Sequence, residues 1–228
     1  MINDQIHLLS GLRALEIGGP SESYKNLNVY SVITGCDGLN FASDPSITQG
    51  VPMGDYNYSA GKTGTFYFGE ATDMNFFPDS TYDLILASDV LEHISDPLKA
   101  LKEWRRVVKP GGYLFLVLPR KESNFDHQRP TTTFEHLLDD HARMVDEHDM
   151  THLEEIIKLH DLERDPWAKP FTWFVQRSID NIKHRNLHHH VFDAELLRKC
   201  CEATHLDVVE ISEIFTNYFM FAQVNKNA

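Results

Sequence analysis

The chain has 228 residues, of which 42% are hydrophobic. This length is sufficient for one domain with a filled hydrophobic core but short for two domains of ordinary size. Its formal net charge of −13 argues against a protein that binds nucleic acid, because phosphate contacts require clustered Lys and Arg. No run of about 18 apolar residues predicts a membrane span, and the first residues lack the pattern of a secretory signal.

Cysteine is scarce in this sequence. Besides Cys36, the chain has only the neighbours Cys200 and Cys201, and two adjacent residues in a helical pattern cannot easily form a disulfide with each other. We therefore expect reduced thiols and a soluble, cytoplasmic protein that binds neither nucleic acid nor a membrane.

Strand-like and helix-like segments alternate along the chain. Two continuous apolar runs, residues 82–88 and 112–119, are typical of buried strands that need cover on both faces. Shorter β-favouring runs precede or follow them, at residues 14–18, 29–33, 66–69, 207–214 and 218–224. The last two are joined by a turn, which predicts an antiparallel pair at one edge of the sheet.

The helix signals are clearest between the two apolar runs. Asp96 is a suitable N-cap and Pro97 suits the first helical turn. An apolar stripe follows at Leu98, Leu101, Trp104 and Val108, and the sequence KPGG ends it. A second capped helix is predicted after Asp193.

Two stretches interrupt this alternation. Residues 35–64 are rich in Gly, Ser, Asp, Asn and Pro and have no helical period, so we predict a long loop. Residues 121–170 hold thirteen acids against six Lys or Arg, and capping boxes at Thr132 and Thr151 predict two helices there. We therefore predict a single domain over residues 1–228, with a helical lid inserted at residues 121–170.

The first strand ends in a turn with few side chains, ALEIGGPS, residues 14–21. In open α/β sheets, ligands bind beyond the carboxyl ends of the strands, and glycines allow a ligand to approach the backbone closely. A tight turn without a ligand explains the same residues, so this motif alone does not decide between the two interpretations.

A longer segment adds specificity. Read from Phe68 to Pro119, it contains FGEATD, the strand YDLILAS, DVLEH, a helix, and PGG before the next strand. In this order, and together with ALEIGGPS, it resembles the class I S-adenosylmethionine-dependent methyltransferases. The resemblance covers about residues 13–119 and 191–224. It implies a doubly wound α/β fold: a mostly parallel, seven-stranded Rossmann-like sheet with a C-terminal antiparallel edge pair and a helical insertion after the fifth strand.

The same resemblance implies a set of residues for the cofactor S-adenosylmethionine. Glu16, Gly18 and Gly19 would line its methionine part, and Asp37 would be the acid after the second strand that holds the ribose. The positions beside the adenine and under the sulfonium would be taken by Glu70, Ala71 and Ser88.

Some positions depart from the family pattern. Pro20 and Glu22 replace glycines in the first turn, which leaves open a non-catalytic module that senses a cofactor or binds a partner. Asp37 would equally serve as a turn former beside a glycine, and Glu70 as a solvated acid.

The segment DVLEH offers acid and base groups at the predicted crevice. Asp89, Glu92 and His93 have a spacing that allows them to converge on one divalent metal ion, which we do not expect. Alternatively, Glu92 and His93 form a hydrogen-bonded brace, or His93 is a base that acts without metal.

Two further segments should lie near the mouth of the crevice. FDHQRP follows the fifth strand and contributes His127 and Arg129, and the run His188–His190 precedes the helix after Asp193. We expect one functional histidine in this run. The predicted catalytic candidates are therefore His93, His127 and His189.

The combination of histidine and acid bases favours a hydroxyl acceptor, because removing its proton is the step that a base accelerates. We expect an S-adenosylmethionine-dependent methyltransferase that acts on a small-molecule or glycan acceptor, such as a terminal sugar hydroxyl. A phenolic or quinone-like acceptor is the alternative, with aromatic lining from Phe171, Trp173 and Phe174. The identity of the acceptor and the oligomeric state are left open.

Overall fold

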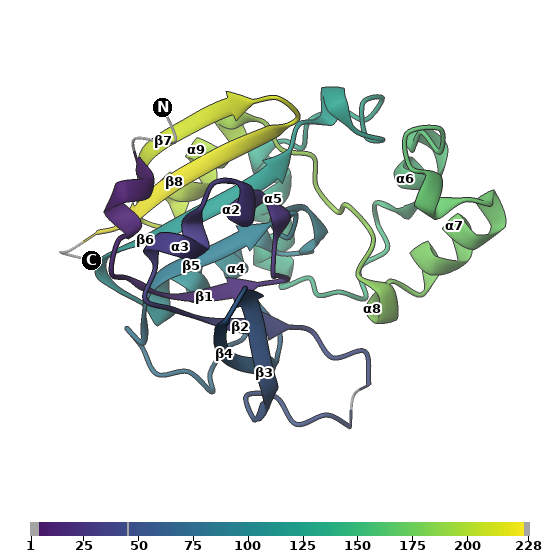
Figure 1. The fold of residues 1–228 in the computed structure, drawn as a ribbon. Helices are drawn as coiled ribbons and strands as arrows, with labels where there is room; N and C mark the ends of the chain where they lie inside the picture. The colour runs from purple at the N-terminus through teal and green to yellow at the C-terminus, as the bar shows by residue number, and fades with distance from the viewer. Residues whose placement is uncertain (1–4, 45, 226–228) are drawn as a thin grey trace.

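The computed structural model describes residues 5–44 and 46–225. Its centre is an eight-stranded sheet in the order β3-β4-β2-β1-β5-β6-β8-β7 (Figure 1). The strands are β1 (Arg13–Ile17), β2 (Gly35–Asn40), β3 (Pro52–Ser59), β4 (Lys62–Phe68), β5 (Tyr82–Ser88), β6 (Val108–Pro119), β7 (Leu206–Ile214) and β8 (Asn217–Val224).

The middle of the sheet is parallel and both edges are antiparallel. β4, β2, β1, β5 and β6 pair in parallel. β3 pairs with β4 in the antiparallel sense, as do β8 with β6 and β7 with β8. The predicted Rossmann-like sheet with a C-terminal antiparallel pair is therefore confirmed, with one strand more than the seven predicted.

Helices cover both faces of the sheet (Figure 1). One apolar core joins a face of the sheet to η1 (His7–Leu9), α2 (Glu22–Asn26) and α3 (Val29–Val32). The opposite core joins it to α4 (Pro97–Val107), α5 (Phe134–Arg143) and α9 (Ala194–Ala203). The inner strands are buried on both sides, which explains why β5 and β6 are continuous apolar runs.

The predicted starts of two helices are confirmed. The Asp96 carboxylate accepts a hydrogen bond from the Lys99 backbone N–H at 2.9 Å, and Pro97 lies in the first turn of α4. At α9, the Asp193 carboxylate accepts from the Leu196 N–H at 2.8 Å. Both caps satisfy backbone donors that a helix start leaves unpaired.

Two predictions about the first third of the chain are wrong. Residues 29–33 do not form a strand, because Val29–Val32 is the short helix α3, which buries Tyr30 against the sheet. Residues 35–64 are not a loop, since they contain β2, β3 and the start of β4. The alternation of buried Tyr56 and Tyr58 with exposed neighbours in β3 is the period-two signal that the Gly- and Asp-rich composition obscured.

The helical segment between β6 and α9 continues past residue 170 and divides into two parts. Helix α5, capped by Thr133 rather than Thr132, packs on α4 and α9 as part of the body. Residues 145–187, here called the lid, hold α6 (Leu153–Leu159), η4 (Pro166–Ala168), α7 (Phe171–Ile179) and α8 (Asn181–His184). The lid has an apolar cluster of its own, which centres on Ile156, Ala168, Phe174 and Leu187.

Among the residues that the structure describes, no helix has the length and apolar character that crossing a membrane requires.

Candidate functional site

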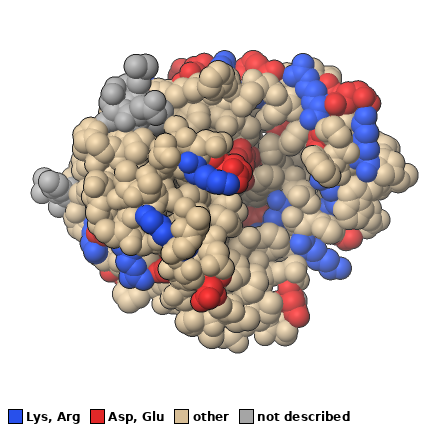
Figure 2. All heavy atoms as spheres, in the orientation of Figure 1, with Lys and Arg blue, Asp and Glu red and all other residues tan. Residues whose placement is uncertain are grey.

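A cavity of about 270 Å³ lies at the carboxyl ends of the parallel strands, between the sheet and the lid. Figure 2 shows that this face of the molecule is hollowed between the two. The residues that follow β1, β2, β4 and β5 line one side, and lid residues and their neighbours line the other. The lining consists of Ile17, Gly18, Asn40, Phe41, Gly69, Glu70, Ala71, Thr72, Asp89, Val90, His93, Ile94, Glu147, Arg185 and Asn186. This is the position at which open α/β sheets bind ligands.

Gly18 gives the cavity its exposed backbone. The residue has a φ of +77°, and a Cβ placed there would lie 2.8 Å from Cγ2 of Val90. Both the left-handed backbone and the close contact favour glycine. In the glycine turn that follows β1, Gly18 is therefore the glycine that lines the cavity.

Glu16 and Gly19 lie in the same turn, but neither is among the cavity-lining residues. The Glu16 carboxylate is fully buried and accepts hydrogen bonds from the hydroxyls of Tyr30 and Tyr56 at 2.8 and 2.7 Å. Burial raises the pKa of Glu16, and the bonds from the two tyrosines partly offset this rise. A Cβ at Gly19 would lie 2.2 Å from the Glu16 side chain, so this glycine makes room for the protein's own carboxylate.

Asp37 does not follow the second strand as predicted, because it lies within β2 opposite Leu15 of β1. Its buried carboxylate accepts from Arg13 at 2.6 Å, from the Thr65 backbone at 2.9 Å and from the Tyr82 hydroxyl at 3.0 Å. The Asp37 carboxylate is therefore hydrogen-bonded within the sheet, and Asp37 is not among the cavity-lining residues. The residue that ends β2 and lines the cavity is Asn40.

Glu70 and Ala71 line the cavity after β4. The Glu70 carboxylate pairs with the Arg185 guanidinium at 2.6 Å, and the same guanidinium lies 3.1 Å from the Glu147 carboxylate. It also lies 5.2 Å from the ring centre of Phe41. Arg185 therefore connects the lid to the body across the rim of the cavity.

Ser88 ends β5, and its hydroxyl donates to the carboxylate of the next residue, Asp89, at 2.8 Å. Asp89 lines the cavity, whereas Ser88 is not among the lining residues. Asp89 has a φ of +55°, which is uncommon for a residue with a side chain. Burial raises the pKa of Asp89, so its carboxyl group is less acidic than usual.

His93 is the one predicted catalytic histidine that lines the cavity. Its Nδ1 lies 3.0 Å from the Leu187 carbonyl, and a carbonyl can only accept, so the proton is on Nδ1 and Nε2 has a free lone pair. Burial lowers the pKa of His93 well below its usual value of 6.5. A neutral imidazole of this kind can accept a proton at neutral pH.

A second group of polar side chains lies beside His93. The rings of His93 and His188 are 4.5 Å apart, and His188 Nδ1 lies 2.5 Å from the Asp126 carboxylate. Burial alone would raise the pKa of Asp126, but His188 and the buried Arg129 lower it to about 2. Asp126 therefore stays ionised and orients the His188 ring.

Of the three residues in DVLEH that the sequence suggested as metal ligands, only Glu92 and His93 lie close together. Glu92, His93 and His188 place possible ligand atoms within 4.8 Å of one another, and Asp89 does not belong to this group. The Glu92 carboxylate is buried and finds no hydrogen-bond partner in the described part of the chain. Burial raises the pKa of Glu92 well above its usual value, which favours a neutral carboxyl group.

The other two predicted catalytic histidines lie outside the cavity lining. His127 pairs with Asp161 at 2.9 Å. His189 is fully buried, 3.2 Å from the Asn181 side chain and 3.7 Å from Glu147. Sequence reasoning missed the cavity residues that come from the lid and its end, Glu147, Arg185 and Asn186, since no local pattern marks them.

Comparison with known proteins agrees with this geometry. Residues 54–116 match the family model described as "Methyltransferase domain". The chain is 34% identical over 112 residues to cycloartenol-C-24-methyltransferase 1 of Oryza sativa, a match that covers 47% of this chain and 30% of that protein. It is 43% identical over 35 residues to the ubiquinone biosynthesis O-methyltransferase of Aliivibrio fischeri, which covers 15% of each. These matches span less than a third of either relative.

Solved structures share the whole fold. A SAM-dependent methyltransferase from Aquifex aeolicus superposes with a TM-score of 0.51 at 15% identity, covering 98% of this chain and 87% of that one. A putative methyltransferase of Haloferax volcanii, solved in complex with the Trm112 activator, gives a TM-score of 0.52 at 13% identity and covers 97% and 88%. The fold and the matched region confirm the predicted resemblance to the class I S-adenosylmethionine-dependent methyltransferases. S-adenosylmethionine is the cofactor of this family.

Proposed function

We propose that this protein transfers the methyl group of S-adenosylmethionine to a hydroxyl of a small or terminal acceptor, such as a sugar of a glycan or a glycosylated metabolite. The observation that carries the proposal is the cavity at the carboxyl ends of the strands, whose lining includes both the exposed backbone of Gly18 and the side chain of His93.

The lining fits a sulfonium nucleoside. Gly18 leaves the volume that a Cβ would fill, and Asn40 ends β2 with a side chain that can both donate to and accept from ribose hydroxyls. Glu70 and Ala71 offer a carboxylate and an apolar contact for the adenine side of the cavity. When bound, the cofactor supplies an electrophilic methyl group.

The residues of this chain then have two tasks, to align the acceptor and to take its proton. His93 Nε2 is the proposed base, since Nδ1 already donates to the Leu187 carbonyl. A positioned base contributes about 10²–10⁴-fold to such a reaction. Asp89, which lines the same cavity and has a raised pKa, can accept a hydrogen bond from the acceptor or donate one to it.

The shape and lining favour a small polar acceptor. Glu147, Arg185 and Asn186 close one side of the cavity, which limits what can enter. Of the three aromatic residues that would suit a phenolic acceptor, Phe174 is buried in the lid, and Phe171 and Trp173 are exposed on its surface. Since the cavity lining includes none of them, a sugar hydroxyl is favoured over a phenol.

The test is calorimetric titration of the protein with S-adenosylmethionine and S-adenosylhomocysteine. We expect Gly18→Arg to abolish binding, because its side chain would fill the cavity beside Val90. Gly11→Arg is the matched control: Gly11 has a similar φ of +81°, and nothing lies within 4 Å of its Cβ position. Retained binding in Gly18→Arg, or equal loss in both variants, would refute this placement.

A second experiment tests the acceptor class. Purified protein with radiolabelled S-adenosylmethionine is offered saccharides with free hydroxyls and, in parallel, simple phenols. We expect label to appear on the saccharides and the reaction to need His93. Transfer to phenols alone would overturn the acceptor while leaving the methyl-transfer assignment in place.

A further inference from the structure

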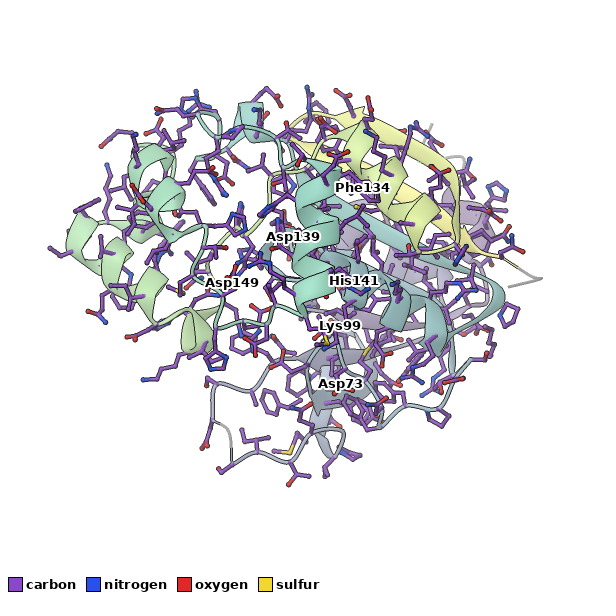
Figure 3. All side chains as sticks on the ribbon, turned by 180° about the vertical axis from the view of Figure 1, so that it is seen from behind. Asp73, Lys99, Phe134, Asp139, His141 and Asp149 are labelled. Atoms are coloured by element: carbon purple, nitrogen blue, oxygen red, sulfur yellow. The ribbon has the colours of Figure 1, made fainter. Side chains whose placement is uncertain are left out.

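Four possible metal ligands converge at a place outside the cavity lining. They are His136 and Asp140 on α5, His152 at the start of α6, and His190 on the segment that precedes α9. Their ligand atoms all lie within 4.8 Å of one another. Figure 3 shows α5 from behind, between the sheet and the lid. From this arrangement we infer that the protein binds a zinc-type divalent transition metal at His136, Asp140, His152 and His190.

The distances are those of a coordination shell. His136 Nε2 lies 3.1 Å from His152 Nε2 and 3.1 Å from Asp140 Oδ2. The Asp140 Oδ2 lies 4.0 Å from His152 Nε2 and 3.9 Å from His190 Nε2. Metal–ligand bonds of about 2.0–2.1 Å in a tetrahedron place neighbouring ligands about 3.3 Å apart. Two separations are near this value, and the other two need a contraction of roughly 0.6 Å.

The polar groups are poorly satisfied without an ion. Asp140 is fully buried, and its Oδ2 has no hydrogen-bond partner in residues 5–44 and 46–225. His136 Nε2 faces both this oxygen and His152 Nε2, but one N–H can satisfy only one of them well. A buried carboxylate oxygen without a partner is costly, and a cation between the three atoms would satisfy all of them.

The surroundings prepare Asp140 and His190 for this role. Arg143 hydrogen-bonds the other carboxylate oxygen of Asp140, Oδ1, which orients Oδ2 toward the histidines, as outer contacts commonly do for metal ligands. His190 is fully buried, and its Nε2 now donates to the Ser95 carbonyl at 3.0 Å. Binding a metal at this nitrogen replaces that hydrogen bond and moves the proton to Nδ1.

The ligand set selects the class of metal. Three imidazole nitrogens and one carboxylate oxygen suit Zn²⁺ and its transition-metal neighbours, whereas Mg²⁺ and Ca²⁺ require mainly oxygen. Four protein ligands make a closed site, which is typical of a structural metal. Since α5 belongs to the body and His152 begins the first lid helix, the metal would fasten the lid to the body.

The test uses the full-length protein, stripped with a chelator and titrated with Zn²⁺ by calorimetry. We expect one Zn²⁺ per chain. Replacing a direct ligand, as in Asp140→Asn or the double variant His136→Gln/His152→Gln, should weaken binding by more than about 100-fold, beyond the usual effect of outer contacts. His148→Gln is the matched control, because this exposed lid histidine pairs with Asp146 outside the cluster.

Two more measurements keep the result unambiguous. Co²⁺ bound to the unaltered protein should give the intense visible absorption of a tetrahedral site, which does not depend on how variants fold. His93→Gln should keep full Zn²⁺ affinity, because His93 belongs to the other histidine group. The inference is overturned if the unaltered protein takes up no Zn²⁺, if His93→Gln abolishes uptake, or if Asp140→Asn and His148→Gln bind alike.

Discussion

Arg185 offers the sharpest test of how the lid is held against the cavity. Its guanidinium pairs with Glu70 after β4, pairs with Glu147 in the lid, and lies against the ring of Phe41. Replacing Arg185 with Gln keeps most of the side-chain volume but removes the charge. The carboxylates of Glu70 and Glu147 then lose their common cation, and we expect the lid to separate more easily from the body.

The size of the effect follows from the burial of each partner. The Glu147 side chain is only 10% exposed, and its carboxylate forms an ion pair with Arg185 at 3.1 Å; an interaction with such a largely buried charge is worth about 1.5–3 kcal/mol. The Glu70 side chain is 32% exposed, so solvent screening reduces that pair to about 0–1 kcal/mol. The contact with Phe41 adds about 0.5–1 kcal/mol. We therefore expect Arg185→Gln to lower the free energy of unfolding by about 2–5 kcal/mol.

The pH dependence provides a second check. Burial raises the pKa of Glu147, but His189 and Arg185 together lower it below its usual value of 4.5. A carboxylate with a lowered pKa in the folded protein stabilises the fold above the unfolded pKa, and this contribution is lost as the pH falls. The stability difference between the original protein and Arg185→Gln should be complete at neutral pH and should shrink below about 4.5.

The assay is urea denaturation at several pH values, combined with hydrogen exchange of the lid. Lys183→Gln is the control, because Lys183 lies exposed on α8, which ends directly before Arg185, and the substitution removes the same charge. We expect faster exchange in residues 145–187 for Arg185→Gln only. Equal effects of the two variants, or a difference that grows as the pH falls, would refute the reasoning.

Three further predictions concern the site. His93→Gln should lower kcat by about 10²–10⁴-fold with little change in cofactor affinity. Because burial lowers the pKa of His93, the rate of the original protein should not change as the pH is lowered through 6.5, and a loss of rate centred at that pH would contradict this. Tyr56→Phe removes a 2.7 Å hydrogen bond to Glu16 and should cost about 1.5–3 kcal/mol of stability by urea denaturation. Asp126→Asn removes the carboxylate that Arg129 and His188 share and should lower the free energy of unfolding by urea denaturation. A decrease of less than about 1 kcal/mol would show that these two contacts contribute little to stability.

The parts of the fold that the sequence predicted are those with strong local signals. β5 and β6 are continuous apolar runs, and α4 and α9 begin at Asp96 and Asp193, whose side chains cap them. Such signals depend on a few neighbouring residues and survive in any tertiary context. From these signals the sequence correctly predicted the parallel centre of the sheet and the antiparallel pair at its C-terminal edge.

The errors occur where distant contacts outweigh local preference. GCDGLN reads as a turn, yet it forms β2, because Arg13 and Tyr82 from neighbouring strands pair with Asp37 inside the sheet. VYSVI reads as a strand, yet it is helical where Tyr30 reaches the buried Glu16. No pattern within either stretch contains its partners, which lie 24 to 45 residues away in the first case.

The candidate site shows the same division. Gly18, Glu70, Ala71 and His93 lie in recognisable motifs and line the cavity, and their roles in binding and catalysis stay predictions. Arg185 completes the cavity from a segment 115 residues beyond its partner Glu70. A residue of this kind can be found only after the chain is folded, since neither its type nor its neighbours indicate a partner.

The segment that precedes α9 links the cavity to the proposed metal site. Arg185 borders the cavity, His188 pairs with Asp126, and His190 belongs to the metal-ligand cluster. Residues 185–193 have no helix or strand of their own, so their course depends on contacts with other parts of the chain, these side-chain contacts among them. Fixing His190 with a metal would restrict where Arg185 can lie. We therefore expect metal occupancy to change how firmly the lid is held and how long the cofactor stays bound, more than the proton transfer at His93.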